Sequence, residues 1–135
     1  MYHNTCFVTE STTSKNDLLK LGIKEDGIIT ISPGVDHKLF HPSVKSKYPS
    51  VVYFGGMRKY KRPHEVLHLL ETLHKKLRDI KLIIIGTGPE EEGLKKLSNE
   101  MKLQNYVEFK GRISSIELSA IVASSWFYQY IMLWV

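Results

Sequence analysis

The sequence predicts an α/β fold with a Rossmann-like, doubly wound parallel sheet, because three short apolar runs alternate with segments of helical length. The runs cover residues 51–54, 82–85 and 107–109, and each is followed closely by a glycine. Such alternation is typical of right-handed βαβ crossovers. The first two runs are apolar almost throughout, as expected for strands that helices cover on both faces.

The helices between these runs are indicated by apolar spacing and by their end signals. Pro63 suits the first turn of a helix whose leucines form one broad stripe. The glutamates at 90–92 complement the N-terminal dipole of a second helix. Ser114 or Ser115 is expected to cap a further helix that runs through Ala123.

The two ends of the chain carry different signals. Residues 6–8 and 28–31 are predicted to be short strands, and Thr13 or Ser14 to cap a helix that ends at Gly22. Residues 126–135 begin like another strand and stay almost entirely apolar to the last position. Since an uncovered apolar strand invites aggregation, the pattern indicates truncation, with a frameshift near residue 125 as one cause.

Composition bounds the function only loosely. The chain has 135 residues, a net charge of +5 and a single cysteine, so it has no internal disulfide and suits the reducing cytoplasm. Its charge suits nucleic acid, anionic membrane surfaces or phosphorylated small molecules without choosing among them. His64 and His68 would share a helix face, but a solvated face explains them without a metal. No run reaches the roughly 20 apolar residues of a spanning helix.

Three loops at the carboxyl ends of the predicted strands hold the candidate site residues, because ligands bind there in open parallel sheets. The first, residues 55–63, combines Gly55 and Gly56 with four cations, among them Arg58 and Lys61. Glycines let a ligand approach the backbone, and the cations can neutralise phosphate. A solvated basic loop that needs glycine for turning is the alternative, and it explains the residues equally simply.

The other two loops give weaker signals on their own. Gly86 opens a turn that lacks the third glycine of a dinucleotide fingerprint and the Gly-Lys-Ser/Thr of a phosphate-binding loop. Gly111, Arg112 and Ile113 could frame a base or direct an arginine toward phosphate, or form an ordinary exposed turn. No nucleophile elbow or pair of catalytic acids is recognisable.

Taken in order, these segments resemble family 4 of the GT-B glycosyltransferases, over almost all of residues 6–125. The resembling stretches are FVTES (7–11), DLL (17–19), ISPGVD (31–36), FHP (40–42), VYFG (52–55), KYKRP (59–63), LIIIGTGPE (82–90) and VEFKGR (107–112). The resemblance implies two Rossmann-like domains, the first for the acceptor and the second for a nucleoside-diphosphate sugar. It also implies retention of anomeric configuration, with no metal or other cofactor.

The resemblance assigns the parts of this chain as well. Residues 1–36 correspond to the tail of the acceptor domain and the interdomain connection, 37–48 to a linker, and 49–135 to a truncated nucleotide-sugar-binding domain. The acceptor domain would then be separate, and the full enzyme could associate peripherally with a membrane. A non-catalytic module that binds anions or nucleic acid, and a subunit of a split enzyme, remain the alternatives, although nucleic acid is not the expected partner.

By resemblance, Lys61 is the catalytic residue, which holds the donor diphosphate and stabilises the leaving group. Gly55 lies under the phosphate, and the remaining substrate-binding positions surround the nucleotide. These are Gly56, Arg58, Gly86, Gly111, Arg112 and Ile113. The family usually has arginine where this chain has Gly56, so Arg58 is expected to reach the anion from a shifted position. The family's paired glutamates are missing, and we therefore expect no useful catalysis by this chain alone.

Overall fold

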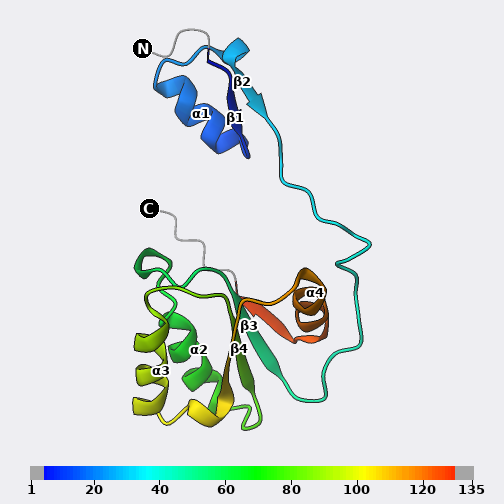
Figure 1. Cartoon of the computed structure of the whole chain (residues 1–135), viewed down its shortest axis with the longest axis vertical. Helices are drawn as coiled ribbons and strands as arrows, with labels where there is room; N and C mark the ends of the chain where they lie inside the picture. The colour runs from blue at the N-terminus through cyan, green and yellow to red at the C-terminus, as the bar shows by residue number, and fades with distance from the viewer. Residues whose placement is uncertain (1–4, 130–135) are drawn as a thin grey trace. The chain divides into compact units, whose positions relative to one another are not determined.

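The computed structural model describes residues 5–129 and divides the chain into two compact units, Met1–Asp36 and His37–Val135 (Figure 1). We call them the N-terminal unit and the C-terminal unit and describe each by itself. The part of the apolar terminal segment at residues 130–135 lies outside the described residues.

The N-terminal unit is a small βαβ arrangement. It comprises β1 (Phe7–Thr9), α1 (Thr12–Lys20), the short 3-10 helix η1 (Glu25–Gly27) and β2 (Ile28–Thr30). The two strands pair in parallel, with Phe7 opposite Ile28. Among the described residues of this unit only Thr9 and Ile28 are buried, so little apolar surface holds it together.

The caps of α1 follow from local hydrogen bonding. Ser11, not Thr13 or Ser14, is the N-cap, so that prediction was wrong by two residues or more. Ser11 has the extended backbone a cap requires, and its hydroxyl accepts a hydrogen bond from the Ser14 amide at 3.1 Å. Gly22 ends the helix as predicted, with φ at +84° and its amide bonded to the Leu19 carbonyl.

The C-terminal unit is a doubly wound parallel sheet, as the sequence predicted. Its strand order is β5-β4-β3-β6, with all three pairings parallel. The strands are β3 (Ser50–Phe54), β4 (Lys81–Ile85), β5 (Val107–Gly111) and β6 (Phe127–Gln129). Helices α2 (Glu65–His74) and α3 (Glu91–Glu100) lie on one side of the sheet, and α4 (Ser115–Ser124) lies on the other (Figure 1).

The hydrophobic core lies between the sheet and the α2–α3 layer. It contains Val51, Tyr53, Met57, Val66, Leu67, Leu70, Ile80, Leu82, Ile84, Leu94 and Leu103. Full burial of one such side chain contributes about 1.5–3 kcal/mol. The opposite face is covered less completely by the described residues, because Ile83 is only half-buried and Phe54 is 44% exposed. The prediction that helices cover both faces of the first two strands is therefore only partly correct.

Local signals set the helix ends of this unit. Helix α2 begins at Glu65 instead of Pro63, because the 3-10 turn η2 (Lys59–Lys61) and a left-handed Arg62, with φ of 44°, come first. Ser114 caps α4 as predicted, by accepting a hydrogen bond from the Glu117 amide.

The end of the predicted linker is attached to the C-terminal unit. Lys45 donates to the carbonyls of Ser125 and Ala123, at 2.6 and 3.3 Å, and so caps the carboxyl end of α4. The Ser46 amide donates to the Ser124 carbonyl, and the Trp126 indole donates to the Ser46 carbonyl. These bonds bring residues 45–48 beside the start of β3.

Candidate functional site

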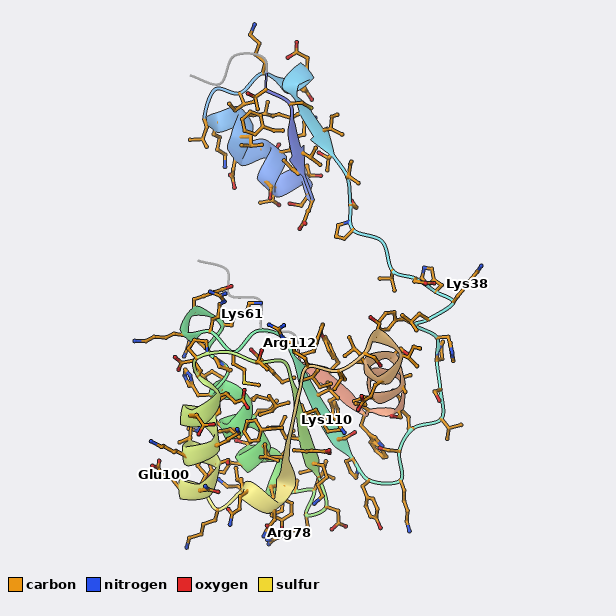
Figure 2. All side chains as sticks on the ribbon, viewed as in Figure 1. Lys38, Lys61, Arg78, Glu100, Lys110 and Arg112 are labelled. Atoms are coloured by element: carbon orange, nitrogen blue, oxygen red, sulfur yellow. The ribbon has the colours of Figure 1, made fainter. Side chains whose placement is uncertain are left out.

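The candidate site is the edge of the sheet where β3, β4 and β5 end. The chain order reverses between β3 and β6, which makes their carboxyl ends a topological switch point, the usual ligand site of open parallel sheets. Figure 2 shows Lys61 and Arg112 at this end of the C-terminal unit, whereas Arg78 and Glu100 lie at the other end. The connection after β6 starts outside the described residues.

Two glycine loops meet backbone to backbone at this edge. A Cβ on Gly86, whose φ is +125°, would lie 2.1 Å from the Gly55 carbonyl oxygen. A Cβ on Gly88 would lie 2.3 Å from the Met57 carbonyl oxygen. Real Cβ atoms do not approach backbone so closely, so both positions require glycine and leave the loop backbone uncovered by side chains.

Backbone hydrogen bonds lock the three predicted loops together. The Gly55 amide donates to Ile85 at 3.0 Å, and the Gly86 amide donates to the Gly111 carbonyl at 2.7 Å. The structure therefore joins three of the predicted glycines in one continuous network. Met57, which sequence reasoning missed, adds an amide bond to Thr87 and accepts one from Glu90.

Met57 anchors the basic loop in the core. Its side chain is fully buried although it stands between glycine and arginine in the sequence. A lone apolar residue inside an otherwise polar loop was the only signal that could have indicated this anchor. Its burial fixes the loop's path, so the cations that follow it project from a firmly held backbone.

Lys61 lies directly over the glycine turn. A Cβ built on Gly55 would be 3.9 Å from the Lys61 Nζ, and that atom lies 6.0 Å from the centre of the Tyr60 ring. The Lys61 residue is half-buried, and within residues 5–129 no carboxylate forms an ion pair with it. A positive charge therefore stands uncompensated over exposed backbone, which is suited to binding an anion.

The arginines of this edge divide into two kinds. Arg62 pairs with Glu65 on the first turn of α2, so its charge is balanced. Arg58 and Arg112 are exposed, and the described part of the chain gives neither an ion pair. Ile113 is half-buried beside Arg112. Arg58 contacts Lys61 through the backbone, because its carbonyl accepts a hydrogen bond from the Lys61 amide at 2.9 Å. Arg112 and Ile113 follow the end of β5 on the same edge.

Tyr53, in β3, supports the loop that follows this strand. Sequence reasoning missed this role because the residue was interpreted only as part of a strand. Its hydroxyl donates to the Gly56 carbonyl at 3.4 Å, and a Cβ on Gly55 would lie 3.8 Å from it. Burial raises the pKa of the Tyr53 phenol, and the nearby Tyr60 adds to this effect. The phenol thus stays neutral and available as a donor to the loop.

The remaining observations concern metal-binding clusters and membrane-spanning helices within residues 5–129. Residues 5–129 contain no cluster of three or more histidine, cysteine, aspartate or glutamate side chains that could hold a metal ion. His64 and His68 lie edge to face, with ring centres 6.5 Å apart. No helix in this part of the chain is long and apolar enough to cross a membrane.

The geometry of this edge can be compared with known proteins. The family model described as "Glycosyl transferases group 1" matches residues 36–131. The chain belongs to this family. The resemblance inferred from the sequence is therefore confirmed, and with it the assignment of the chain to a family of sugar-transferring enzymes.

Curated relatives share part of their length with this chain. The GDP-mannose-dependent alpha-(1-6)-phosphatidylinositol monomannoside mannosyltransferase of Mycobacterium tuberculosis is 27% identical over 101 residues. The match covers 67% of this chain and 26% of that enzyme. The chain thus matches about a quarter of the length of these relatives.

Solved glycosyltransferases share the fold. A TarM variant from S. aureus, in complex with fondaparinux, alpha-GlcNAc-glycerol and UDP, aligns with a TM-score of 0.73 and 19% identity over 87% of this chain and 23% of that one. Anabaena HepE in complex with UDP and glucose aligns with a TM-score of 0.69 and 17% identity, over 88% of this chain and 36% of that one. The C-terminal domain of the Francisella tularensis group 1 protein LpcC aligns with a TM-score of 0.59 and 21% identity, over 70% of this chain and 57% of that one.

Proposed function

We propose that the C-terminal unit binds a nucleoside-diphosphate sugar at the edge formed by the β3, β4 and β5 loops. The observation that carries the proposal is Lys61, whose ammonium lies over the Gly55 backbone with no carboxylate partner among residues 5–129. A diphosphate is the anionic part of such a donor, and the glycine loops let it approach the backbone.

Lys61 acts on the leaving group. As the bond between the anomeric carbon and the phosphate oxygen breaks, negative charge grows on the nucleoside diphosphate. A fixed ammonium at that position stabilises the charge, and its rigid support means that little reorganisation is needed. Arg58 and Arg112 add positive potential at the same edge, and the resemblance makes the transfer a retaining one.

The identity of the base is open to experiment. The curated relative's name specifies GDP-mannose, whereas two of the solved structures contain UDP. Gly111, Arg112 and Ile113 are the positions we assign to the surroundings of the nucleotide. Their loop follows β5, which β4 separates from β3, the strand that leads into the Lys61 loop.

The acceptor is assigned to a part of the enzyme outside the C-terminal unit. We assign residues 1–36 to the tail of an acceptor domain and residues 37–48 to the linker that follows it. The chain alone should then bind the donor without sustained turnover. The lipid acceptor in the relative's name supports a whole enzyme that works at the surface of a membrane.

Thermal unfolding of the purified chain with UDP, GDP and ADP tests the proposal. We expect one nucleotide to raise the melting temperature, with Lys61→Ala removing the shift. Lys59→Ala is the matched control, because Lys59 is an exposed lysine on the same 3-10 turn. A folded chain that ignores all three nucleotides would refute the proposal. An equal shift in Lys61→Ala would refute the assigned role of Lys61.

A further inference from the structure

Tyr60 is an exposed aromatic residue at the centre of the basic loop. It is the middle residue of the 3-10 turn η2, and it directly precedes Lys61. The residue is 66% exposed and does not belong to the hydrophobic core. Packing in the core therefore does not account for its ring, whose neighbours are the groups of the candidate donor site.

The backbone that carries Tyr60 is held on both sides. Met57, three residues before Tyr60, and Pro63, three residues after it, are both fully buried. Within the turn, the Lys61 amide donates to the Arg58 carbonyl at 2.9 Å. The side chains of Tyr60 and Lys61 therefore extend from a fixed backbone, and the main freedom left is in the long side chain of the lysine.

The Lys61 ammonium lies near two groups at once. Its Nζ is 6.0 Å from the centre of the Tyr60 ring and 3.9 Å from the position of a Cβ on Gly55. A lysine side chain has a flexible four-carbon stem, so an ammonium without such neighbours occupies many positions. The face of an aromatic ring attracts a cation at this distance, and this attraction favours the position over the glycine turn.

The pKa of the Tyr53 phenol gives further evidence that Tyr60 lies against the loop. Burial raises this pKa, and the nearby Tyr60 raises it further, because two phenolates would repel each other. The Tyr53 hydroxyl lies 3.8 Å from the Cβ position of Gly55. Tyr53, Tyr60 and Lys61 therefore gather around the same glycine turn.

We propose that Tyr60 is a positioning residue, whose ring face holds the Lys61 ammonium over the Gly55 turn. Its effect on the donor rests on the proposed function, because that effect requires a diphosphate bound by Lys61. The placement of the ammonium does not, since it is a property of the chain without a ligand. Tyr60 thus acts through Lys61, and its own contact with the donor is not needed.

Titration calorimetry of the full chain with UDP, GDP and ADP tests this role through the nucleotide that binds. Tyr60→Ala should weaken binding about two- to fivefold, the loss expected for one exposed cation–π contact. Tyr60→Phe keeps the ring face and should bind like the wild type. In a Lys61→Ala background, Tyr60→Ala should cause no further loss. Circular dichroism checks that each variant is folded.

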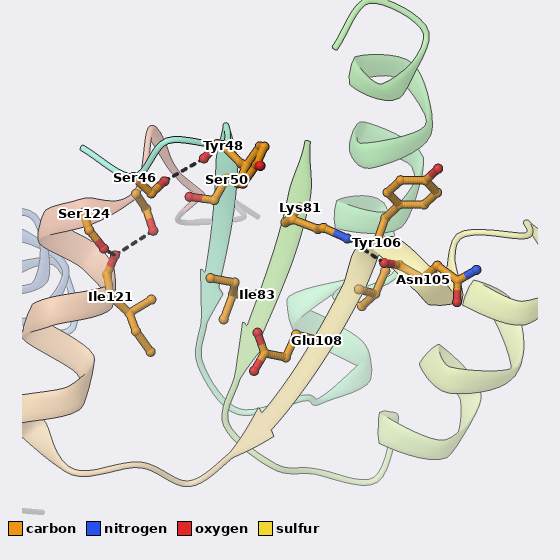
Figure 3. Close-up of a pocket in the computed structure, with 12 residues that line it drawn as sticks. Ser46, Tyr48, Ser50, Lys81, Ile83, Asn105, Tyr106, Glu108, Ile121 and Ser124 are labelled. Carbon is orange, nitrogen blue, oxygen red and sulfur yellow. Dashed lines mark hydrogen bonds between the residues drawn. The ribbon is translucent and has the colours of Figure 1, made fainter. Parts of the chain in front are cut away.

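Tyr48→Ala is the matched control. The Lys47 Nζ lies 5.5 Å from the centre of the Tyr48 ring, and Tyr48 is 53% exposed, so this is a second exposed tyrosine beside a lysine. Tyr48 lines a pocket with Ser50 and Lys81, the first residues of β3 and β4 (Figure 3). Because these are the opposite ends of the strands from the Lys61 loop, Tyr48→Ala should leave nucleotide binding unchanged.

Three results of the titration would overturn the inference. One is wild-type affinity in Tyr60→Ala, and another is an equal loss in Tyr60→Ala and Tyr60→Phe, which would assign the effect to the hydroxyl. The third is a loss of the same size when Lys61 is already alanine, which would place the ring in direct contact with the nucleotide.

Failure of the proposed function gives a different pattern. If the folded wild type binds none of the three nucleotides, the proposed function is refuted, and NMR of the chain without ligand decides the role of Tyr60. The Lys61 ε-methylene protons should then change their chemical shift in Tyr60→Ala, because the ring current is lost, and stay near the wild-type value in Tyr60→Phe. Unchanged shifts in Tyr60→Ala would overturn the inference.

Discussion

The two units of this chain differ in how they are held together. The C-terminal unit buries a continuous apolar core between its sheet and the α2–α3 layer, whereas α1 of the N-terminal unit buries no residue. Two short strands and one exposed helix give little independent stability. It follows that the site geometry depends on the C-terminal core, and that caps and ion pairs matter relatively more in the N-terminal unit.

The largest effect should come from a cavity in the C-terminal core. Leu70→Ala removes a fully buried side chain and should destabilise the unit by about 2–5 kcal/mol. Leu18→Ala is the matched change in the N-terminal unit, where the side chain is only half-buried, and should cost less than about 1.5 kcal/mol. Denaturant unfolding followed by circular dichroism measures both. Equal losses would contradict the contrast between the units.

A smaller effect, confined to the donor edge, is expected at Gly86. Gly86→Ala would force a Cβ within 2.1 Å of the Gly55 carbonyl oxygen and impose a strained φ of +125°. We expect a loss of about 1–3 kcal/mol in stability, together with loss of the nucleotide-induced thermal shift.

Gly93→Ala is the control for this change. Gly93 lies in α3, and a Cβ added there would meet no neighbouring atom within 4 Å, so alanine should stabilise the helix by up to about 1 kcal/mol. The same chemical change should thus have opposite signs at the two glycines. Tolerance of Gly86→Ala with nucleotide binding intact would contradict the packing of the two loops.

The smallest effect concerns the ion pair of the N-terminal unit. The hydrogen bond from Lys15, at 2.7 Å, and its positive charge lower the pKa of Glu25 below 4.5. A lowered pKa in the folded state gives stability that is present above pH 4.5 and lost as the pH falls through the folded-state pKa. Glu25→Gln should therefore speed hydrogen exchange in α1 slightly at about pH 7 but not at about pH 3, once the difference in intrinsic exchange rate is removed. An equal effect at both values would show that the charge is not responsible.

Much of the C-terminal fold could be predicted because its local signals agree. The apolar runs at 51–54 and 82–85 lie within β3 and β4, and Ser114 caps α4. The start of α1 in the N-terminal unit was harder to predict, since Ser11, Thr13 and Ser14 are all residue types that suit an N-cap. Only the backbone geometry of Ser11 and its bond to Ser14 decide among them.

The candidate site was only partly predictable. The glycines and cations of the basic loop could be recognised from residue type and spacing. The support from Tyr53 could not, because it depends on the turn that brings the Gly56 carbonyl back over the Tyr53 hydroxyl. Met57 gave only the signal of an apolar residue in a polar loop, since its bonds to Thr87 and Glu90 form where two loops meet.

The role of Lys61 in binding the donor diphosphate is tested most directly by calorimetric titration of the full chain with UDP and GDP. The wild type, Lys61→Ala and Lys59→Ala are titrated side by side. We predict that one nucleotide binds, that Lys61→Ala weakens its binding by about tenfold or more, and that Lys59→Ala leaves it nearly unchanged. Equal affinity in Lys61→Ala and the wild type would contradict this role.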